Sequence, residues 1–195
     1  MIKGILKQLK QIFIHKWYVF EICCKLGIPL QGLLHDLSKF SFAELIEGAK
    51  YYRGDVSPHV ESRKQLGYSL AWINHKAKNK HHWEWWIDIN EDGEFVPARI
   101  PNKYIKEIIA DRVGACKAYE GKNYNNSSAL NYYNKNKEKY IMHNDTIYLL
   151  EFCLNLLKIQ QDLSLLDLDY YPYFAKELKK SREKECYKKI KEILK

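Results

Sequence analysis

Apolar positions recur with helical spacing along most of the chain. In the first segment Ile5, Leu9, Ile12 and Val19 lie close to a 3.6-residue period, which predicts a helix over residues 2–26. Gly27 ends this helix, and Pro29 suits the first position of the next one, which is predicted over 29–37. The same reasoning predicts further helices over 41–53, 57–79, 101–119, 128–140, 144–166 and 172–195.

Two local signals refine this pattern. Residues 87–96 alternate apolar and polar positions around Asp92-Gly93, which is typical of a small β-hairpin. Ser41 and Glu44 have the spacing of a capping box at the start of a helix. The sequence therefore predicts an all-α fold, a bundle of about seven or eight helices with a minor β-hairpin near 87–96. We expect one domain over 1–195, with 172–195 as a basic C-terminal helix packed on it or extending from it.

Composition narrows the class of protein. Hydrophobic residues make up 46% of the 195 residues and aromatic residues 14%, which excludes a disordered chain. The longest apolar region, 12–34, is interrupted by charged residues, so no membrane span is expected, and no secretory leader is recognised. The five cysteines form no CxxC pair and are odd in number, which favours buried free thiols. We expect a soluble, cytoplasmic protein, whose oligomeric state the sequence leaves open.

Positive charge is concentrated at the end of the chain. The whole sequence carries a net charge of +8, and residues 176–195 hold nine Lys and Arg against four Glu, a net +5. Such a helix could bind nucleic acid or an anionic surface, although a solvated helix face is the commoner explanation. Lysines also accompany apolar residues near the N-terminus, as in a membrane-surface helix. His15 argues against that alternative, because it indicates that the helix belongs to the core.

Histidines and aspartates lie among apolar neighbours on several predicted helices. An ionised carboxylate buried there, such as Asp36 or Asp111, needs a partner or a metal ion. Nitrogen and oxygen donors without thiolate suit Mn, Fe, Co, Ni or Mg. The plainer interpretations are that Asp36 caps a helix and that Asp111 pairs with Arg112, although adjacent helical residues do not face each other. The histidines in question are His15, His35, His75, His81 and His82.

The spacing of the later histidines predicts a break in the helix. In a continuous helix His75 and His82 would lie about 10 Å apart along the axis, which is far for one ion. We therefore expect the helix to break near Asn79 so that His81-His82 folds back. The alternative is that only one of the two joins His75.

The order His15, His35-Asp36 and Asp111 resembles the H…HD…D pattern of the HD-domain metal-dependent phosphohydrolase superfamily. The segments HDLSK and HHWE are similar to the HD-x-G-K and HHE segments of its cyclic-dinucleotide phosphodiesterase branch. Ser38 replaces the glycine, and the GYP signature is missing. A closer resemblance is to a small uncharacterised group of bacterial and phage proteins. They share HDLSKF, the stretch 71–86 with HHWEWW, and the segment 132–143, so that the similarity covers about 15–157.

The resemblance implies an HD-like helical domain with a metal site. His15, His35, Asp36 and Asp111 would hold one ion, and Asp36 could bridge to a second ion held by His75 and either His81 or His82. We expect a site for one ion and treat a site for two ions as its extension.

The activity implied is hydrolysis of a phosphate ester, of a nucleotide in particular, by a metal-activated water. Asp36 and Lys39 would be catalytic, and Lys39, Asn79 and Arg112 would contact the substrate. His59 and His143 are assigned structural roles. Four tryptophans could stack a nucleobase, although packing of the core is the commoner role: Trp72, Trp83, Trp85 and Trp86. The alternative function is a basic helical module that binds nucleic acid or phosphate and keeps only a structural or degenerate HD metal site.

Overall fold

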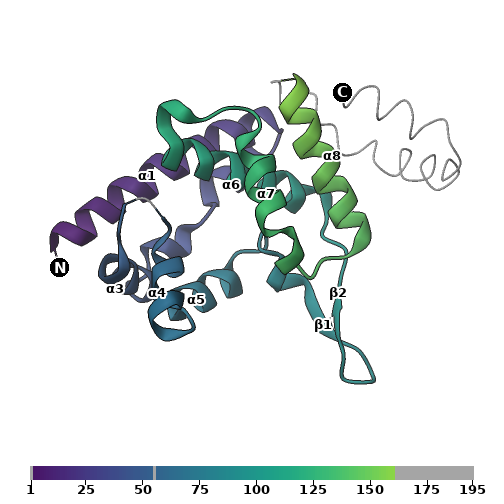
Figure 1. Ribbon diagram of the computed structural model, residues 1–195, viewed down its shortest axis with the longest axis horizontal. Coiled ribbons are helices and arrows are strands. Elements are labelled where there is room, and N and C mark those ends of the chain that lie inside the picture. Colours follow the sequence, from purple (N-terminus) through teal and green to yellow (C-terminus); the bar gives the residue numbers. More distant parts are fainter. Residues whose placement is uncertain (1, 55, 161–195) are drawn as a thin grey trace, which may run out of the picture.

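The structure is a computed structural model that describes residues 2–54 and 56–160 (Figure 1). It confirms an all-α fold with a minor β-hairpin. Eight α-helices lie within the described residues: α1 (Ile2–Lys25), α2 (Pro29–Leu34), α3 (Phe42–Tyr51), α4 (Pro58–Leu66), α5 (Leu70–Lys78), α6 (Asn102–Glu120), α7 (Ser128–Asn136) and α8 (Asn144–Gln160). Short 3-10 turns connect some of them, and one matters below, η1 (Leu37–Phe40).

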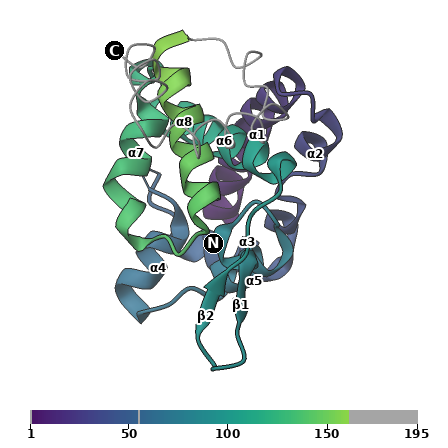
Figure 2. The ribbon, with the colours of Figure 1, turned by 90° about the vertical axis from the view of Figure 1, so that its right-hand side faces the viewer.

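Helices α1 and α6 form the centre of the molecule (Figures 1 and 2). They approach closely because Gly114 of α6 faces Val19 of α1, and a Cβ at position 114 would lie 2.7 Å from Val19 Cγ2. The α2 and α3 helices pack against other parts of α1, whereas α7 and α8 pack against α6. The buried core therefore lies along α1, α6 and α8, with Val19, Ile22, Ile105, Ile109, Val113, Leu149, Leu150 and Leu154 among its members.

The hairpin expected near 87–96 is present. Strand β1 (Ile87–Ile89) pairs antiparallel with β2 (Phe95–Pro97), with Asp88 opposite Val96. Gly93 adopts a positive φ of 81°, which the turn requires. The hairpin projects away from the helices in both views (Figures 1 and 2).

Several boundaries differ from those expected. The helix predicted over 57–79 is two helices, because Gly67 adopts a left-handed conformation that ends α4. The helix predicted over 29–37 ends at Leu34, so the His-Asp pair follows it instead of closing it. The helix expected over 128–140 ends as α7 at Asn136, and a 3-10 turn, Lys137–Lys139, takes the place of its last turn.

The capping box at the start of α3 does not form. Ser41 occupies the N-cap position but its side chain accepts no capping hydrogen bond. The Glu44 carboxylate binds Asn74 and His75 of α5 instead, because those buried donors hold it inside the protein.

Other expectations are partly met. No helix within residues 2–54 and 56–160 combines the length and apolar character needed to cross a membrane. Four cysteines of this part of the chain are free thiols, but Cys24 is exposed, contrary to the expectation that it is buried. The basic helix expected over 172–195 lies outside the described residues.

Candidate metal centre

The connection after α2 turns two ligand-type side chains into the interior. His35 has an extended backbone, and Asp36 has a φ of 53°, the one positive φ of a non-glycine residue in the described part of the chain. This left-handed conformation costs on the order of 1 kcal/mol, and aspartate tolerates it better than most residues do. Both side chains end up almost fully buried, each residue with 1% of its surface exposed.

Four residues expected to hold one ion come together. His15 projects from the core face of α1 and Asp111 from α6, so the close packing of these two helices brings them to the pair after α2. His15 Nε2 lies 3.1 Å from Asp111 Oδ1, and His35 Nε2 lies 3.2 Å from Asp36 Oδ2 and 3.3 Å from Asp111 Oδ1. We call His15, His35, Asp36 and Asp111 the first ligand group.

A second ligand group shares the same aspartate. Helix α5 ends at Lys78, and Asn79 is extended, so the chain folds back as the spacing predicted. His75 Nε2 and His81 Nε2 then lie 3.3 Å and 3.4 Å from Asp36 Oδ1. His82 also offers a nitrogen to this group. Both members of the doublet, and not only one, thus lie with Asp36 and His75.

Two glutamates not predicted as site residues from the sequence orient the histidines. Glu107 Oε1 lies 2.9 Å from His35 Nδ1 and 3.1 Å from His81 Nδ1, and Glu44 Oε2 lies 2.9 Å from His75 Nδ1. An ionised carboxylate can only accept a hydrogen bond, so each Nδ1 carries the proton in the neutral ring. The lone pair of each neutral ring is therefore on Nε2, the atom that points to Asp36.

The unused atoms of the cluster fit a metal ion. The buried Nε2 atoms of His15, His35, His81 and His82 have no hydrogen-bond partner. Buried polar atoms without partners are costly and uncommon in folded proteins. Histidine with its Nδ1–H bonded to a carboxylate and its Nε2 free is the usual form of a metal-binding histidine. This buried cluster of His, Asp and Glu could hold a metal ion.

Neighbouring positive charges keep two carboxylates of the cluster ionised. Burial raises the pKa of Asp36, but the charges of His35, Lys39 and His75 outweigh it and hold the pKa well below its usual range. Burial likewise opposes the shift of Glu107, whose hydrogen bonds from His35 and His81 lower its pKa to about 2. Both carboxylates are thus ionised at neutral pH and available as ligands or acceptors.

The imidazoles differ from one another in charge. Burial lowers the pKa of His35, but Asp36, Asp111 and Glu107 raise it well above its usual value. Burial and the neighbouring histidines hold the pKa of His82 well below its usual value. The raised pKa of His35 favours its protonated form, whose charge offsets part of the negative charge of these carboxylates.

Lys39 and Asn79, two of the residues assigned to the substrate, lie beside the cluster. The Lys39 ammonium forms an ion pair with Asp36 at 2.6 Å, and Asp36 is among the charges that raise its pKa to about 12 against the effect of burial. Asn79 donates to Ser38 Oγ and to the His75 carbonyl, so its amide hydrogens fix the end of α5. Asn79 therefore positions this part of the site.

Arg112, the third residue assigned to substrate contact, points to a different part of the molecule. Its guanidinium donates to the Tyr140 hydroxyl and lies over the rings of Tyr133 and Tyr140. This is a packing contact at the α6–α7 side of the molecule.

Aromatic residues and the remaining histidines complete the surroundings. Trp83 and Trp86 pack against the core, with ring contacts to Tyr140 and Tyr104, which agrees with the commoner interpretation of these residues. His143 Nδ1 accepts from the Asp145 amide at the start of α8, a structural role as expected. His59 lies closer to the centre than expected, because its ring contacts Trp72 and stacks with His75.

The cluster is open mainly on one side. The Asp111 side chain is 24% exposed and Lys39 22%, whereas the other side chains of the first ligand group are 8% exposed or less. Asp111 and Lys39 therefore mark the most exposed side of the cluster.

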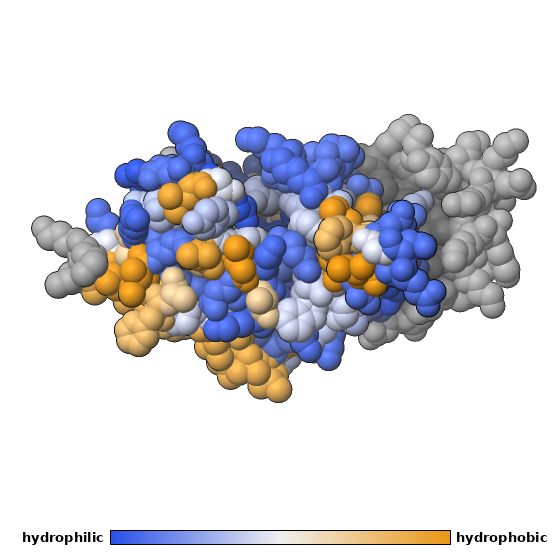
Figure 3. Space-filling view, turned by 90° about the horizontal axis from the view of Figure 1, so that it is seen from below, coloured by the Kyte–Doolittle hydropathy of each residue, from blue (hydrophilic) through white to orange (hydrophobic). Residues whose placement is uncertain are grey.

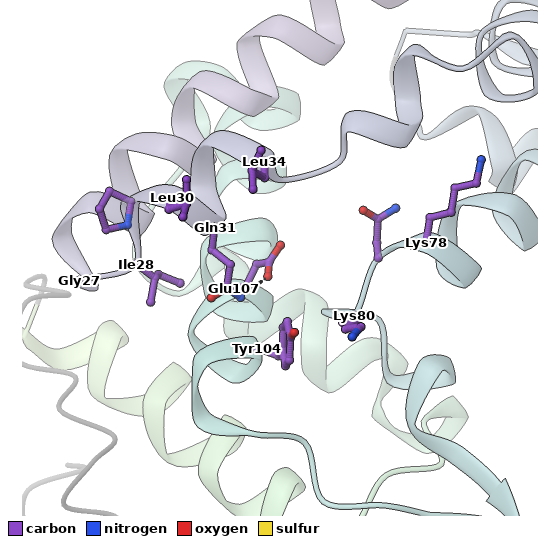
Figure 4. A pocket seen from close by; sticks show the side chains of 11 residues that line it. Gly27, Ile28, Leu30, Gln31, Leu34, Lys78, Lys80, Tyr104 and Glu107 are labelled. Carbon is purple, nitrogen blue, oxygen red and sulfur yellow. Dashed lines mark hydrogen bonds between the residues drawn. The ribbon is translucent and has the colours of Figure 1, made fainter.

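A pocket of about 460 Å³ lies between α2, the end of α5 and α6 and is lined by neither Asp111 nor Lys39. Figure 4 shows that Gln31 reaches toward Glu107 at its inner end, where Gln31 Nε2 donates to Glu107 Oε2. Glu107 lines this pocket, whereas none of the histidines of the two ligand groups does.

Comparison with known proteins gives one match. None of the curated proteins or solved structures matches the chain. The family that matches is described as "Family of unknown function (DUF5662)", and its match covers residues 4–156, which include every residue of both ligand groups. The chain belongs to the DUF5662 family.

Proposed function

We propose that the protein is a metal-dependent phosphohydrolase of the HD type that cleaves a phosphate ester. The observation that carries the proposal is the set of partnerless imidazole Nε2 atoms around Asp36. Two of these rings, His35 and His81, are held through Nδ1 by Glu107, and Glu44 holds His75 in the same way, so that Nε2 of each of these three rings faces Asp36. Together with the order His15, His35-Asp36 and Asp111, this arrangement supports the HD assignment.

Two ions fit the donors better than one. The first ligand group offers two imidazoles and two carboxylates, and the second offers three imidazoles and shares Asp36. Each Asp36 oxygen lies near a different set of histidines, Oδ1 near His75 and His81 and Oδ2 near His35. A carboxylate that bridges two ions would use its oxygens in this way. The imidazole-rich donors and the absence of thiolate from these groups favour Mn, Fe, Co or Ni over Mg.

Ions held there would supply Lewis acidity to a water molecule and to a phosphoryl oxygen, the chemistry that phosphate ester hydrolysis needs. The protein's own groups would position the substrate. Lys39 lies at the open side, protonated, and can bind a phosphate oxygen there. Asp111, the most exposed member of the first ligand group, borders the same opening. The buried remainder of the cluster keeps bulk water from the ligands.

A phosphate group is expected beside Lys39, and we propose a nucleotide monoester or diester as the substrate. The rival function, a basic module that binds nucleic acid, depended on the tail helix at 172–195, which lies outside the described residues.

The test uses the full-length chain loaded with manganese. Hydrolysis of p-nitrophenyl phosphate and bis-p-nitrophenyl phosphate would be measured first, and a panel of nucleoside monophosphates and cyclic nucleotides next. Turnover should be abolished by Asp36→Asn and retained by Asp92→Asn, a matched change at an exposed aspartate of the hairpin. Metal binding without turnover of any of these esters would overturn the enzyme assignment and leave a structural metal site. Salt-sensitive nucleic-acid binding without metal or turnover would favour the rival function.

A further inference from the structure

Helix α1 has a second apolar face, opposite the one that carries His15. Leu6, Phe13 and Trp17 are spaced seven and four residues apart and thus lie on one side of the helix. They are 61%, 61% and 66% exposed. Ile12, His15 and Val19, which are buried, lie on the other side. A helix whose core face is already filled rarely exposes three such large side chains without a binding role.

The neighbouring elements extend this apolar surface. The Phe40 ring of η1 lies 5.4 Å from the Phe13 ring, and Lys16 Nζ donates to the Leu33 carbonyl of α2. Leu33 and Leu37, which follow on α2 and η1, are also exposed. Figure 3 shows hydrophobic groups interleaved with hydrophilic ones across one face of the molecule.

The charges around these residues have one sign. Lys7 and Lys10 are exposed on the same side of α1 as Trp17, and no acidic residue lies between positions 4 and 20. The first acid of α1, Glu21, pairs with Lys25 at 2.9 Å.

The other acids of the segment 4–51 are not available at this surface. Asp36 and Glu44 are buried in the metal centre. Glu47 accepts hydrogen bonds from Ser62, Ser69 and the Ala71 amide. The surface is therefore apolar and basic, with no exposed unpaired acid in that segment.

We propose that this α1 outer face, made of Leu6, Lys7, Lys10, Phe13 and Trp17, docks on an anionic lipid surface. A helix of this kind lies in the plane of the membrane interface, with its apolar side chains among the acyl chains and its lysines at the headgroups. Tryptophan is favoured at that depth. Each lysine near an anionic bilayer contributes about fivefold to binding at physiological salt. The helix remains part of the folded domain, since its other face holds Val19 and His15 in the core.

Charge and side-chain type favour lipid over other occupants. A symmetric dimer through this face would bring Lys7 and Lys10 of both copies into one interface, because the two partners of such a dimer use the same patch. Nucleic acid would attract the lysines through its phosphates but would offer no apolar surface to exposed leucines such as Leu6 and Leu33. An anionic bilayer satisfies both kinds of residue.

The experiment is co-sedimentation of the full-length protein with vesicles of phosphatidylcholine, with and without phosphatidylserine. Binding should require phosphatidylserine and weaken with salt. Trp17→Ser and the double change Lys7→Glu/Lys10→Glu should each lower binding at least about tenfold. Leu66→Ser, at an exposed leucine at the end of α4, is the matched control and should bind as the wild type does. Circular dichroism and manganese binding report whether each variant is folded.

Three results would overturn the proposal. The first is failure of the wild type to sediment with anionic vesicles. The second is equal binding by the wild type and folded variants, which would assign lipid binding to basic residues elsewhere. The third is a concentration-dependent dimer that is lost in Trp17→Ser while lipid binding is absent, which would assign the face to a second copy. Because manganese binding is measured separately, none of these results bears on the metal centre.

Discussion

His35 Nδ1 lies 2.9 Å from Glu107 Oε1, on the side of the imidazole opposite the nitrogen that faces Asp36. The same carboxylate oxygen lies 3.1 Å from His81 Nδ1. One oxygen of α6 therefore orients one histidine of each ligand group, while Gln31 occupies the other oxygen. This shared acceptor links the two groups, so its loss should disturb both.

The first prediction concerns this acceptor. Glu107→Gln removes the negative charge but keeps the shape of the side chain, and one amide oxygen can no longer hold both imidazole protons firmly. We expect manganese affinity to fall about 10- to 100-fold, as for other carboxylates that orient metal-binding histidines. Isothermal titration calorimetry would measure the change. Glu138→Gln, at an exposed glutamate, is the control and should not alter affinity. Unchanged affinity in Glu107→Gln would show that Glu107 does not orient the ligands.

The second prediction concerns pH. In the metal-free protein the pKa of His35 is raised, so its proton stabilises the folded state below about pH 6.5, and this contribution is lost as the pH rises through the raised value. An ion must displace that proton, since the ligand nitrogen has to be deprotonated. The rise in Tm caused by manganese should therefore be larger near pH 8 than near pH 6, with proton release visible as a buffer-dependent binding enthalpy. An equal or smaller rise at the higher pH would contradict the role of His35 as a ligand.

The sequence predicted which His and Asp side chains come together better than it predicted the glutamates that hold them. His15, His35, Asp36 and Asp111 were identified because polar residues stood where the helical pattern required apolar ones, and the fold brings them together. The fold-back after Asn79 was predictable from spacing, because a straight helix would separate His75 from the doublet.

The orienting glutamates carried a weaker signal. Glu44 fits a capping box, and only the packing of α3 on α5 shows that its carboxylate binds His75. Glu107 lies four residues before Asp111, on the same side of α6, and that spacing was the one available indication. The direction of Arg112 depends on where Tyr133 and Tyr140 pack, which periodicity does not determine.

The third prediction separates chemistry from metal binding. Lys39→Met removes the ammonium at the open side of the cluster but leaves the proposed ligands in place. We expect kcat on a phosphate ester to fall by about 100-fold, the size typical of losing one charge that stabilises the transition state, with metal content unchanged. Lys50→Met, at an exposed lysine of α3, should leave both unaffected. If the metal is lost together with activity, the function of Lys39 is to maintain Asp36 and not to bind phosphate.

The fourth prediction concerns the packing that assembles the first ligand group. Gly114→Ala places a methyl group 2.7 Å from Val19 Cγ2 and 3.2 Å from the Val19 amide nitrogen, so α1 and α6 must separate. Overpacking of this kind lowers the free energy of unfolding by about 1–3 kcal/mol. Because His15 and Asp111 lie on these two helices, metal affinity should fall as well. Urea unfolding and calorimetry would measure the two effects, and a variant as stable as the wild type would contradict this packing.

The most direct test of the metal centre is the metal content of the purified protein after loading with manganese and dialysis. Asp36→Asn is the decisive variant, since asparagine tolerates the left-handed backbone at this position but removes the charge that both ligand groups share. We predict two ions per wild-type chain and none per Asp36→Asn chain, with the helical circular dichroism of the two proteins unchanged. Equal metal content in the folded variant and the wild type, or no metal in either, would contradict a metal centre at Asp36.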